Sequence, residues 1–174
     1  PNTVPNAASS HVSIELGIRG VNCTLVQSFC TAEAAILFAC DQLRKGKADL
    51  ILTGGVDELS EFLFRGFSEL HLLATDQGHG EESRPYDQMR NGLVLGEGAG
   101  ILTIETEEHA RARGAKIYGY ILNHSLVGRS SQGNGLEDME RSIKMVLAGR
   151  EGTPIHYLSG AGNSSKVLDA MEAK

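Results

Sequence analysis

Residues 23–55 carry a strand–helix–strand pattern that restricts this chain to a small set of folds. Residues 23–27 form a short run with the character of a buried strand. From Ala32, apolar residues recur at i, i+3, i+4, i+7 and i+11, the spacing of one helix face, and Gly46 ends the helix. Residues 49–53 are a second β-type run. This succession is typical of a βαβ unit, so we predict an α/β fold in which the helix is buried.

The rest of the chain also alternates between the two patterns. Helical spacing and end signals predict helices at 5–16, 107–113, 136–147 and 167–174. Apolar or β-branched runs predict further strands at 100–104, 116–122 and 155–158. Glycine and polar residues predict a long loop at 74–92 and a small-residue loop at 159–165.

The overall charge limits the functions that such a fold can serve. The 174 residues carry a formal net charge of −6, and the basic residues are scattered. Nucleic acids and anionic membranes bind to concentrated basic surfaces, so we expect neither as a partner. No apolar run approaches the length of a membrane span, and residues 1–6 do not have the pattern of a secretory signal. We therefore expect a soluble protein.

The cysteines and histidines argue against a metal site and favour a reducing compartment. The three cysteines lie in residues 23–40 without a CxxC pair, and no two of the six histidines are four residues apart on a helix. We therefore expect no metal and a cytoplasmic protein.

Cys30 lies at the turn where the first strand enters the helix. A thiol at a helix N-terminus faces the positive end of the helix dipole, which favours the thiolate, and unpaired backbone N–H groups there can hold an oxyanion. The alternative is that Cys30 is only a small buried hydrophobic residue. The glycine cluster at 96–100 leads into a strand rather than a helix, so we do not expect it to bind phosphate.

Many short runs along the chain resemble the β-ketoacyl-acyl-carrier-protein synthases, the condensing enzymes of fatty-acid and polyketide synthesis. The matching runs are Pro1-Asn2-Thr3, Asn6, Gly17-Ile18-Arg19-Gly20, Asn22, Ala48-Asp49, Gly54-Gly55, Gly66-Phe67, Arg84-Pro85-Tyr86-Asp87, Arg90, Gly92, Val94, Gly96-Glu97-Gly98-Ala99-Gly100, Glu105, His109-Ala110, Arg113-Gly114-Ala115-Lys116-Ile117-Tyr118, Asp169 and Glu172.

The resemblance implies part of a thiolase-like fold, with layered α-β-α-β-α architecture, mixed sheets and buried helices. Family members are more than twice as long, so residues 1–105 are expected to be the second part of the N-terminal ketosynthase half. Residues 106–174 are expected to be the start of the C-terminal half. The implied partners are acyl carrier protein and a second ketosynthase subunit, in a homodimer or in a heterodimer with an active ketosynthase. No bound cofactor is implied, and the phosphopantetheine of the carrier protein carries the substrate.

The chain departs from the family at two catalytic positions. A gapless match from Asn22 to Gly55 places Phe29 at the nucleophilic cysteine, and Cys30 reaches that position only in a shifted register. Ala161 stands where the family has the first of its two catalytic histidines. An alanine side chain has no proton to donate and no hydrogen bond to offer. Asn163 and Ser165 match two threonines that hold the phosphopantetheine arm in the family.

Three functional hypotheses follow from the resemblance. The main one is a catalytically inactive homologue that acts as a partner or chain-length-factor-like subunit, with the ring of Phe29 filling the acyl pocket. The second is an active synthase that performs decarboxylative Claisen condensation with Cys30. The third is a module that binds acyl carrier protein or an acyl-pantetheine group through Asn163 and Ser165.

Overall fold

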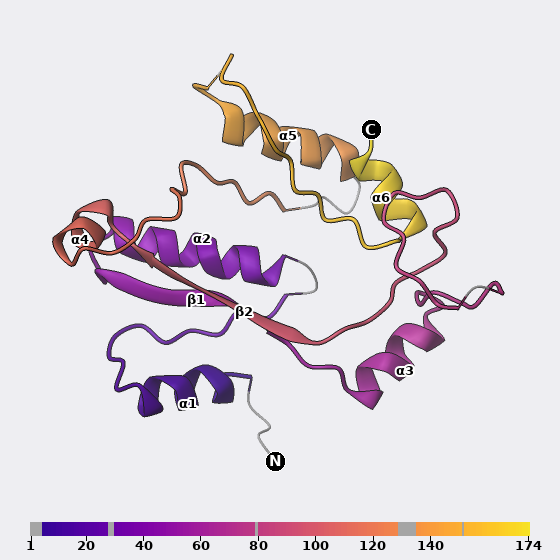
Figure 1. Cartoon of the computed structure of the whole chain (residues 1–174), viewed down its shortest axis with the longest axis horizontal. Coiled ribbons are helices and arrows are strands. Elements are labelled where there is room, and N and C mark those ends of the chain that lie inside the picture. Colours follow the sequence, from indigo (N-terminus) through magenta and orange to yellow (C-terminus); the bar gives the residue numbers. More distant parts are fainter. Residues whose placement is uncertain (1–4, 28–29, 79, 129–134, 151) are drawn as a thin grey trace. The chain divides into compact units, whose positions relative to one another are not determined.

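The computed structural model describes residues 5–27, 30–78, 80–128, 135–150 and 152–174 (Figure 1). The chain divides into two compact units, each made of two segments. Unit 1 comprises Pro1–Val56 and Gly98–Tyr120, and unit 2 comprises Asp57–Glu97 and Ile121–Lys174. Each unit therefore joins residues that are far apart in the sequence.

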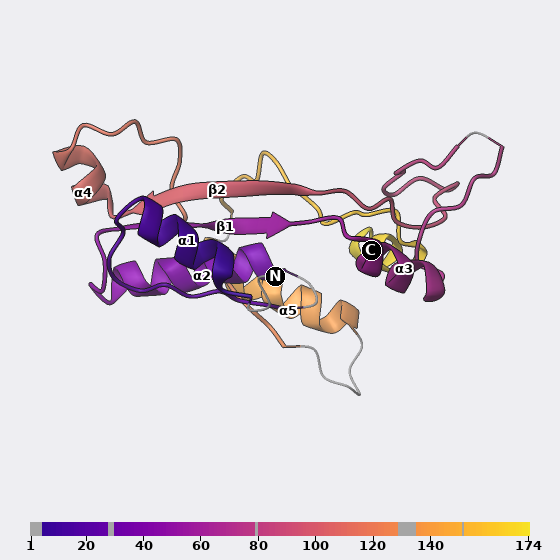
Figure 2. The ribbon, with the colours of Figure 1, turned by 90° about the horizontal axis from the view of Figure 1, so that it is seen from below.

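Unit 1 is built around a pair of strands and one long helix. Strands β1 (Leu50–Asp57) and β2 (Gly98–Glu105) pair in a two-stranded sheet. Helix α2 (Thr31–Arg44) lies along these strands in both views (Figures 1 and 2) and buries Ala34, Ala39, Cys40 and Leu43. The predicted burial of this helix is confirmed. Helices α1 (Ala7–Glu15) and α4 (Glu107–Ala112) complete the unit.

Two adjacent glycines allow β1 to approach its neighbours closely. A Cβ atom at Gly54 would overlap the carbonyl oxygen of Gly100 in β2. A Cβ atom at Gly55 would lie 2.8 Å from the Cβ of Ala32 in α2. Larger residues at these positions would push the strand away from β2 or from α2.

An ionic cluster fixes the junction between β2 and α4. The Glu105 carboxylate accepts hydrogen bonds from Arg113 Nη2 at 2.5 Å and Nε at 2.9 Å, and it lies 2.6 Å from His109 Nδ1. These bonds, first from Arg113 and then from His109, lower the pKa of Glu105 to about 2. Thr106 caps the helix by accepting from the His109 N–H. The helix predicted at 107–113 is thereby confirmed.

The described residues of unit 2 form three helices and long irregular segments. The helices are α3 (Glu61–Glu69), α5 (Gly135–Leu147) and α6 (Lys166–Glu172). Helix α3 begins after Ser60, whose side chain accepts from the Leu63 N–H. Helices α5 and α6 contact each other (Figure 1). An isolated parallel bridge joins Leu73 and Leu93 at the two ends of the predicted 74–92 loop.

Three of the predicted strands are absent from the structure. Segments 23–27, 116–122 and 155–158 adopt no strand, and nothing in the described part of the chain pairs with them. Tyr118 is 89% exposed and Tyr157 is 84% exposed, as expected for β-type runs without a neighbouring strand. The helices expected at 5–16, 136–147 and 167–174 are confirmed as α1, α5 and α6, whereas α3 was not predicted.

Candidate functional site

The turn before α2 presents Cys30 at the surface of unit 1. Cys30 is the residue that precedes the helix, and its backbone is left-handed with φ 56° and ψ 31°. Its carbonyl accepts the Ala34 N–H at 2.9 Å, whereas its thiol makes no capping bond. Because Cys30 is exposed, the alternative that it is a buried hydrophobic residue is wrong. Phe29 lies outside the described residues.

A second cysteine in the same helix has the opposite environment. Cys40 is buried in α2, and burial raises the pKa of its thiol. A buried thiol with a raised pKa reacts slowly, so Cys40 is a packing residue and Cys30 is the accessible one.

The other candidate position lies in the loop at 159–165 of unit 2. This loop is held by two carboxylates of α6, Asp169 and Glu172, which are three residues apart and therefore share a helix face. Both accept hydrogen bonds from backbone N–H groups of the loop. The loop conformation is thus determined mainly by its backbone and by α6.

Asp169 is the most buried carboxylate of this network, with 1% of its surface exposed. It accepts from the backbone N–H groups of Tyr86 at 2.9 Å, Asn163 at 3.0 Å and Ser164 at 3.1 Å. Arg90 Nε lies 3.7 Å from the same carboxylate. Burial of Asp169 opposes its ionisation, but the three N–H donors and the Arg90 charge outweigh it and hold the pKa of the carboxyl below its usual range.

Ser164 joins the loop to the segment that carries Arg84. It is fully buried and has a left-handed backbone with φ 72°. Its hydroxyl accepts the Arg84 N–H at 2.6 Å. Arg90 adds a second connection, because its guanidinium donates to the carbonyl groups of Asp87, Ser165 and Lys166 at 2.7 to 3.3 Å.

Tyr86 links this segment to both carboxylates. Its backbone N–H bonds to Asp169, and its hydroxyl donates to Glu172 Oε2 at 2.5 Å. The same hydroxyl accepts the Gly162 N–H at 3.0 Å. Glu172 also accepts the Ala161 N–H, at 2.8 Å and 3.0 Å from its two oxygens. The hydrogen bond to Glu172 is the main reason why the pKa of the Tyr86 phenol is raised.

The residues predicted for this loop have different capacities. Ala161 is exposed, and its methyl group offers no hydrogen bond. The Asn163 side-chain oxygen accepts the Ser165 N–H at 3.0 Å, and the Ser165 hydroxyl caps α6 by accepting the Leu168 N–H at 3.3 Å. The amide NH₂ of Asn163 and the O–H of Ser165 remain as hydrogen-bond donors, and both residues are partly exposed.

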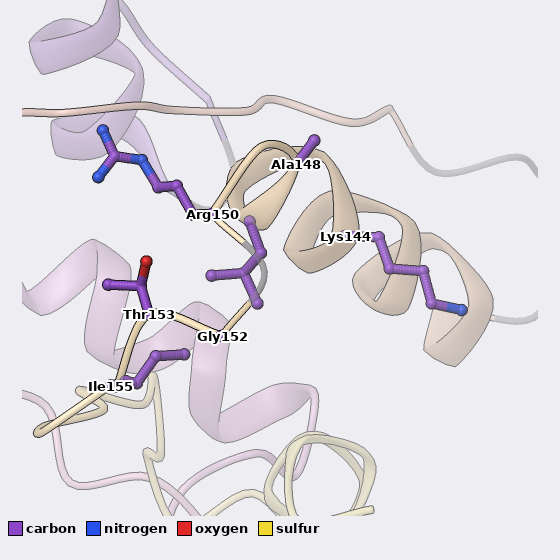
Figure 3. A pocket seen from close by; sticks show the side chains of 7 residues that line it. Lys144, Ala148, Arg150, Gly152, Thr153 and Ile155 are labelled. Carbon is purple, nitrogen blue, oxygen red and sulfur yellow. The ribbon is translucent and has the colours of Figure 1, made fainter.

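A hollow in unit 2 lies elsewhere, beside the C-terminal end of α5 (Figure 3). It has a volume of about 380 Å³ and is lined by Lys144, Leu147, Ala148, Arg150, Gly152, Thr153 and Ile155. The charged ends of Lys144 and Arg150 point away from each other in Figure 3, and the Lys144 ammonium lies 3.3 Å from Glu140. The two cationic side chains of this hollow therefore do not converge on a common anion. None of the predicted site residues lines the hollow.

The described residues contain no group of three or more His, Cys, Asp or Glu side chains suited to hold a metal ion. Among the same residues, every helix is too short or too polar to cross a membrane.

The sequence alone did not assign a structural role to the residues that hold the loop. Tyr86, Arg90, Asp169 and Glu172 stand out in the sequence only as parts of runs that match the family. The spacing of Asp169 and Glu172 was a usable signal, since residues three apart on a helix share a face. The contact of Tyr86 with this face was not predictable from spacing, because the residues are more than 80 positions apart.

Comparisons with family models and curated sequences give consistent results. The model described as "Beta-ketoacyl synthase, N-terminal domain" matches residues 1–110. A 3-oxoacyl-[acyl-carrier-protein] synthase 2 of Staphylococcus aureus is 34% identical over 184 residues, covering 100% of this chain and 45% of the relative. Nodulation protein E of Rhizobium leguminosarum bv. trifolii is 36% identical over 177 residues, covering 99% of this chain and 43% of the relative. The chain thus spans less than half the length of these relatives.

Solved structures with similar folds belong to the same group of proteins. The ishigamide ketosynthase/chain length factor has a TM-score of 0.86 at 31% identity, covering 98% of this chain and 42% of that one. A beta-ketoacyl synthase from Burkholderia phymatum STM815 has a TM-score of 0.85 at 30% identity, covering 98% and 43%. A type II polyketide ketosynthase in complex with its acyl-carrier protein has a TM-score of 0.85 at 26% identity, covering 95% and 43%.

Proposed function

This chain belongs to the β-ketoacyl synthase family, and we propose that it acts there as a catalytically inactive subunit that partners an active ketosynthase, in the manner of a chain-length factor. The family assignment and the thiolase-like α/β fold agree with the predictions from sequence. The similarity to a ketosynthase/chain length factor structure supports the partner role.

Ala161 is the observation that carries the proposal. Decarboxylation of a malonyl donor needs a hydrogen-bond donor or a proton relay at this position, and a methyl group supplies neither. The loop around Ala161 is nevertheless well ordered by bonds to Asp169, Glu172 and Tyr86. These bonds involve no side-chain atom of residue 161, so the architecture of the loop persists without a histidine.

Residues 1–105 would form the second part of the N-terminal ketosynthase half, and residues 106–174 would begin the C-terminal half. The match of the N-terminal family model to residues 1–110 supports this division. We also propose that the protein is cytoplasmic and that its partners are acyl carrier protein and a ketosynthase subunit. The three cysteines are free thiols, in agreement with a reducing compartment.

Catalytic inactivity is tested by measuring the decarboxylation of malonyl-loaded acyl carrier protein by the whole protein. We expect no release of CO₂ above the rate without protein, and no change on treatment with iodoacetamide. Condensation of an acyl group with malonyl-loaded acyl carrier protein that disappears when Cys30 is alkylated would instead establish the second hypothesis, an active synthase. That alternative is favoured by the exposed position of Cys30 before α2.

The partner role is tested by co-expression with an intact ketosynthase of the same organism, followed by size-exclusion chromatography with light scattering. We expect a one-to-one heterodimer. A stable homodimer that excludes the ketosynthase would contradict the partner role, and binding of acyl carrier protein by that homodimer would favour the third hypothesis. The remaining donors of Asn163 and Ser165 are the feature that supports such binding.

A substitution at Ala161 tests the claim that the loop does not depend on this side chain. Ala161 is exposed, and its N–H is held by Glu172. We therefore expect Ala161→His to change the free energy of unfolding by less than about 0.5 kcal/mol, as is usual for surface positions. A loss of several times this value would show that the alanine has a packing role.

A further inference from the structure

The ring of Tyr86 lies directly against the backbone of two loop glycines. A Cβ atom at Gly162 would lie 2.5 Å from the ring carbons Cε2 and Cζ, and a Cβ atom at Gly160 would overlap the phenol oxygen. The absence of side chains at residues 160 and 162 leaves the space that the Tyr86 ring and hydroxyl occupy against the loop. No pattern in the sequence connects Tyr86 with Gly160 and Gly162.

Tyr86 is also held in an unfavourable backbone conformation. Its φ of 62° is in the left-handed region, which costs a non-glycine residue about 1–2 kcal/mol. This conformation is compatible with bonds from its backbone to Asp169 and from its hydroxyl to Glu172 and Gly162. The hydroxyl thus connects helix α6 to the loop at the residue before Asn163.

We propose that Tyr86 is a positioning residue for the phosphopantetheine arm, because its hydroxyl fixes the backbone at Gly162 and thereby the adjacent amide group of Asn163. The inference rests on the proposed carrier-protein partner and specifies how this chain would hold the carrier's prosthetic group. Asn163 is the contacting residue, and Tyr86 acts through it.

The hydroxyl and the ring make separable contributions. Tyr86→Phe keeps the ring against Gly162 but removes the donor to Glu172 and the acceptor for the Gly162 N–H. Fixing the loop in advance reduces the ordering cost on binding, so a looser loop binds the arm more weakly. An added ordering cost of about 1.4 kcal/mol, the size of a typical lost hydrogen bond, would weaken the binding of the arm about tenfold.

A double-mutant cycle tests this inference on the whole protein with its ketosynthase partner. The probe is acyl carrier protein bearing unacylated phosphopantetheine, with the same carrier lacking the arm as a reference. Binding is measured for the wild type, Tyr86→Phe, Asn163→Ala and the double variant. We expect Tyr86→Phe to weaken arm-dependent binding about tenfold and to add nothing further in the Asn163→Ala background.

Tyr118→Phe is the matched control, because Tyr118 is 89% exposed and its hydroxyl makes no hydrogen bond to the described residues. It should leave binding unchanged. A purely structural role of Tyr86 predicts that the effects of Tyr86→Phe and Asn163→Ala add, and that result would overturn the inference. Additive effects would not contradict the proposal that acyl carrier protein is a partner.

A complementary pair of substitutions tests the position of the phenol oxygen. Gly160→Ala introduces a methyl group at this oxygen, so it should weaken arm-dependent binding, and Tyr86→Phe should relieve part of that loss. No rescue would contradict the geometry. If the wild type binds both forms of the carrier equally, the arm-binding part of the proposed function fails, which is a different outcome from additivity in the cycle.

Discussion

The strongest prediction for stability concerns Asp169→Asn, which preserves the shape of the side chain and removes its charge. Asp169 is 1% exposed and accepts three backbone N–H groups, two at Oδ2 and one at Oδ1. Asparagine has one acceptor oxygen, and its NH₂ group is a donor. Whichever way the amide is turned, at least one buried N–H faces another donor.

The magnitude follows from these contacts. Each orphaned donor costs about 1–3 kcal/mol, and breaking a buried charge pair by removing one partner costs about 3–5 kcal/mol. The pair with Arg90 is long, at 3.7 Å, and Arg90 has three carbonyl acceptors of its own. We therefore expect Asp169→Asn to lower the free energy of unfolding by about 3 kcal/mol, mainly through the orphaned N–H groups.

Urea unfolding and amide hydrogen exchange measure this effect globally and locally. Exchange at Tyr86, Asn163 and Ser164 should accelerate in Asp169→Asn, because these amides lose their acceptor. Asp87→Asn is the matched control, since Asp87 belongs to the same segment but is exposed. A loss below about 0.5 kcal/mol, equal to that of the control, would refute the assignment of Asp169 as the organiser of the loop.

The same carboxylate predicts a pH dependence. The pKa of Asp169 is lowered in the folded protein, so the stability that its carboxylate contributes is fully present above the pKa of the unfolded state, about 3.9. This stability is lost as the pH falls from there through the lower pKa of the folded state. The difference in stability between the wild type and Asp169→Asn should therefore shrink below about pH 4.

Three further predictions concern unit 1, and the first is paired with a control substitution in helix α3 of unit 2. Gly54→Ala should lower the free energy of unfolding by about 1–3 kcal/mol, measured by thermal or urea unfolding, because its methyl group overlaps a carbonyl of β2. Gly66→Ala is the control: it lies in the middle of α3 with open space around it, so it should raise the free energy of unfolding by about 0.5–1 kcal/mol. Glu105 has a folded pKa of about 2, so it should contribute stability above its usual pKa of 4.5 that is lost as the pH falls towards 2, and Glu105→Gln should remove this dependence in acid titrations. Iodoacetamide should modify Cys30 in the native protein and Cys40 only after unfolding, as read by peptide mass spectrometry.

The sequence predicted best the elements whose stability comes from their own residues or from near neighbours. Helix α2 combines a clear apolar period with burial of Ala39 and Leu43, so its pattern and its packing agree. Helix α3 was not predicted, although Ser60 followed by Glu61 was a signal for the start of a helix that could have found it. Segments 116–122 and 155–158 have strand-like composition, but a strand also needs a hydrogen-bonded neighbour, which no local pattern reports.

For the candidate site, the sequence identified positions but not the contacts between them. Ala161, Asn163 and Ser165 were located through the resemblance, and Cys30 through its place before a helix. Whether Phe29 occupies the nucleophile position stays a prediction, since it lies outside the described residues. The role of Tyr86 depends on contacts across more than 70 residues, which only the three-dimensional arrangement brings together.

The distribution of hydrogen bonds in the loop explains why the conformation of the loop does not depend on the side chain at position 161. Asp169 and Glu172 accept backbone N–H groups from residues 161, 163 and 164, and such bonds are available to any residue except proline. The side chain at position 161 makes none of these bonds, so replacing a histidine there costs little stability. Selection for a structural partner would then preserve Asp169, Glu172 and the glycines against Tyr86, while position 161 is left unconstrained.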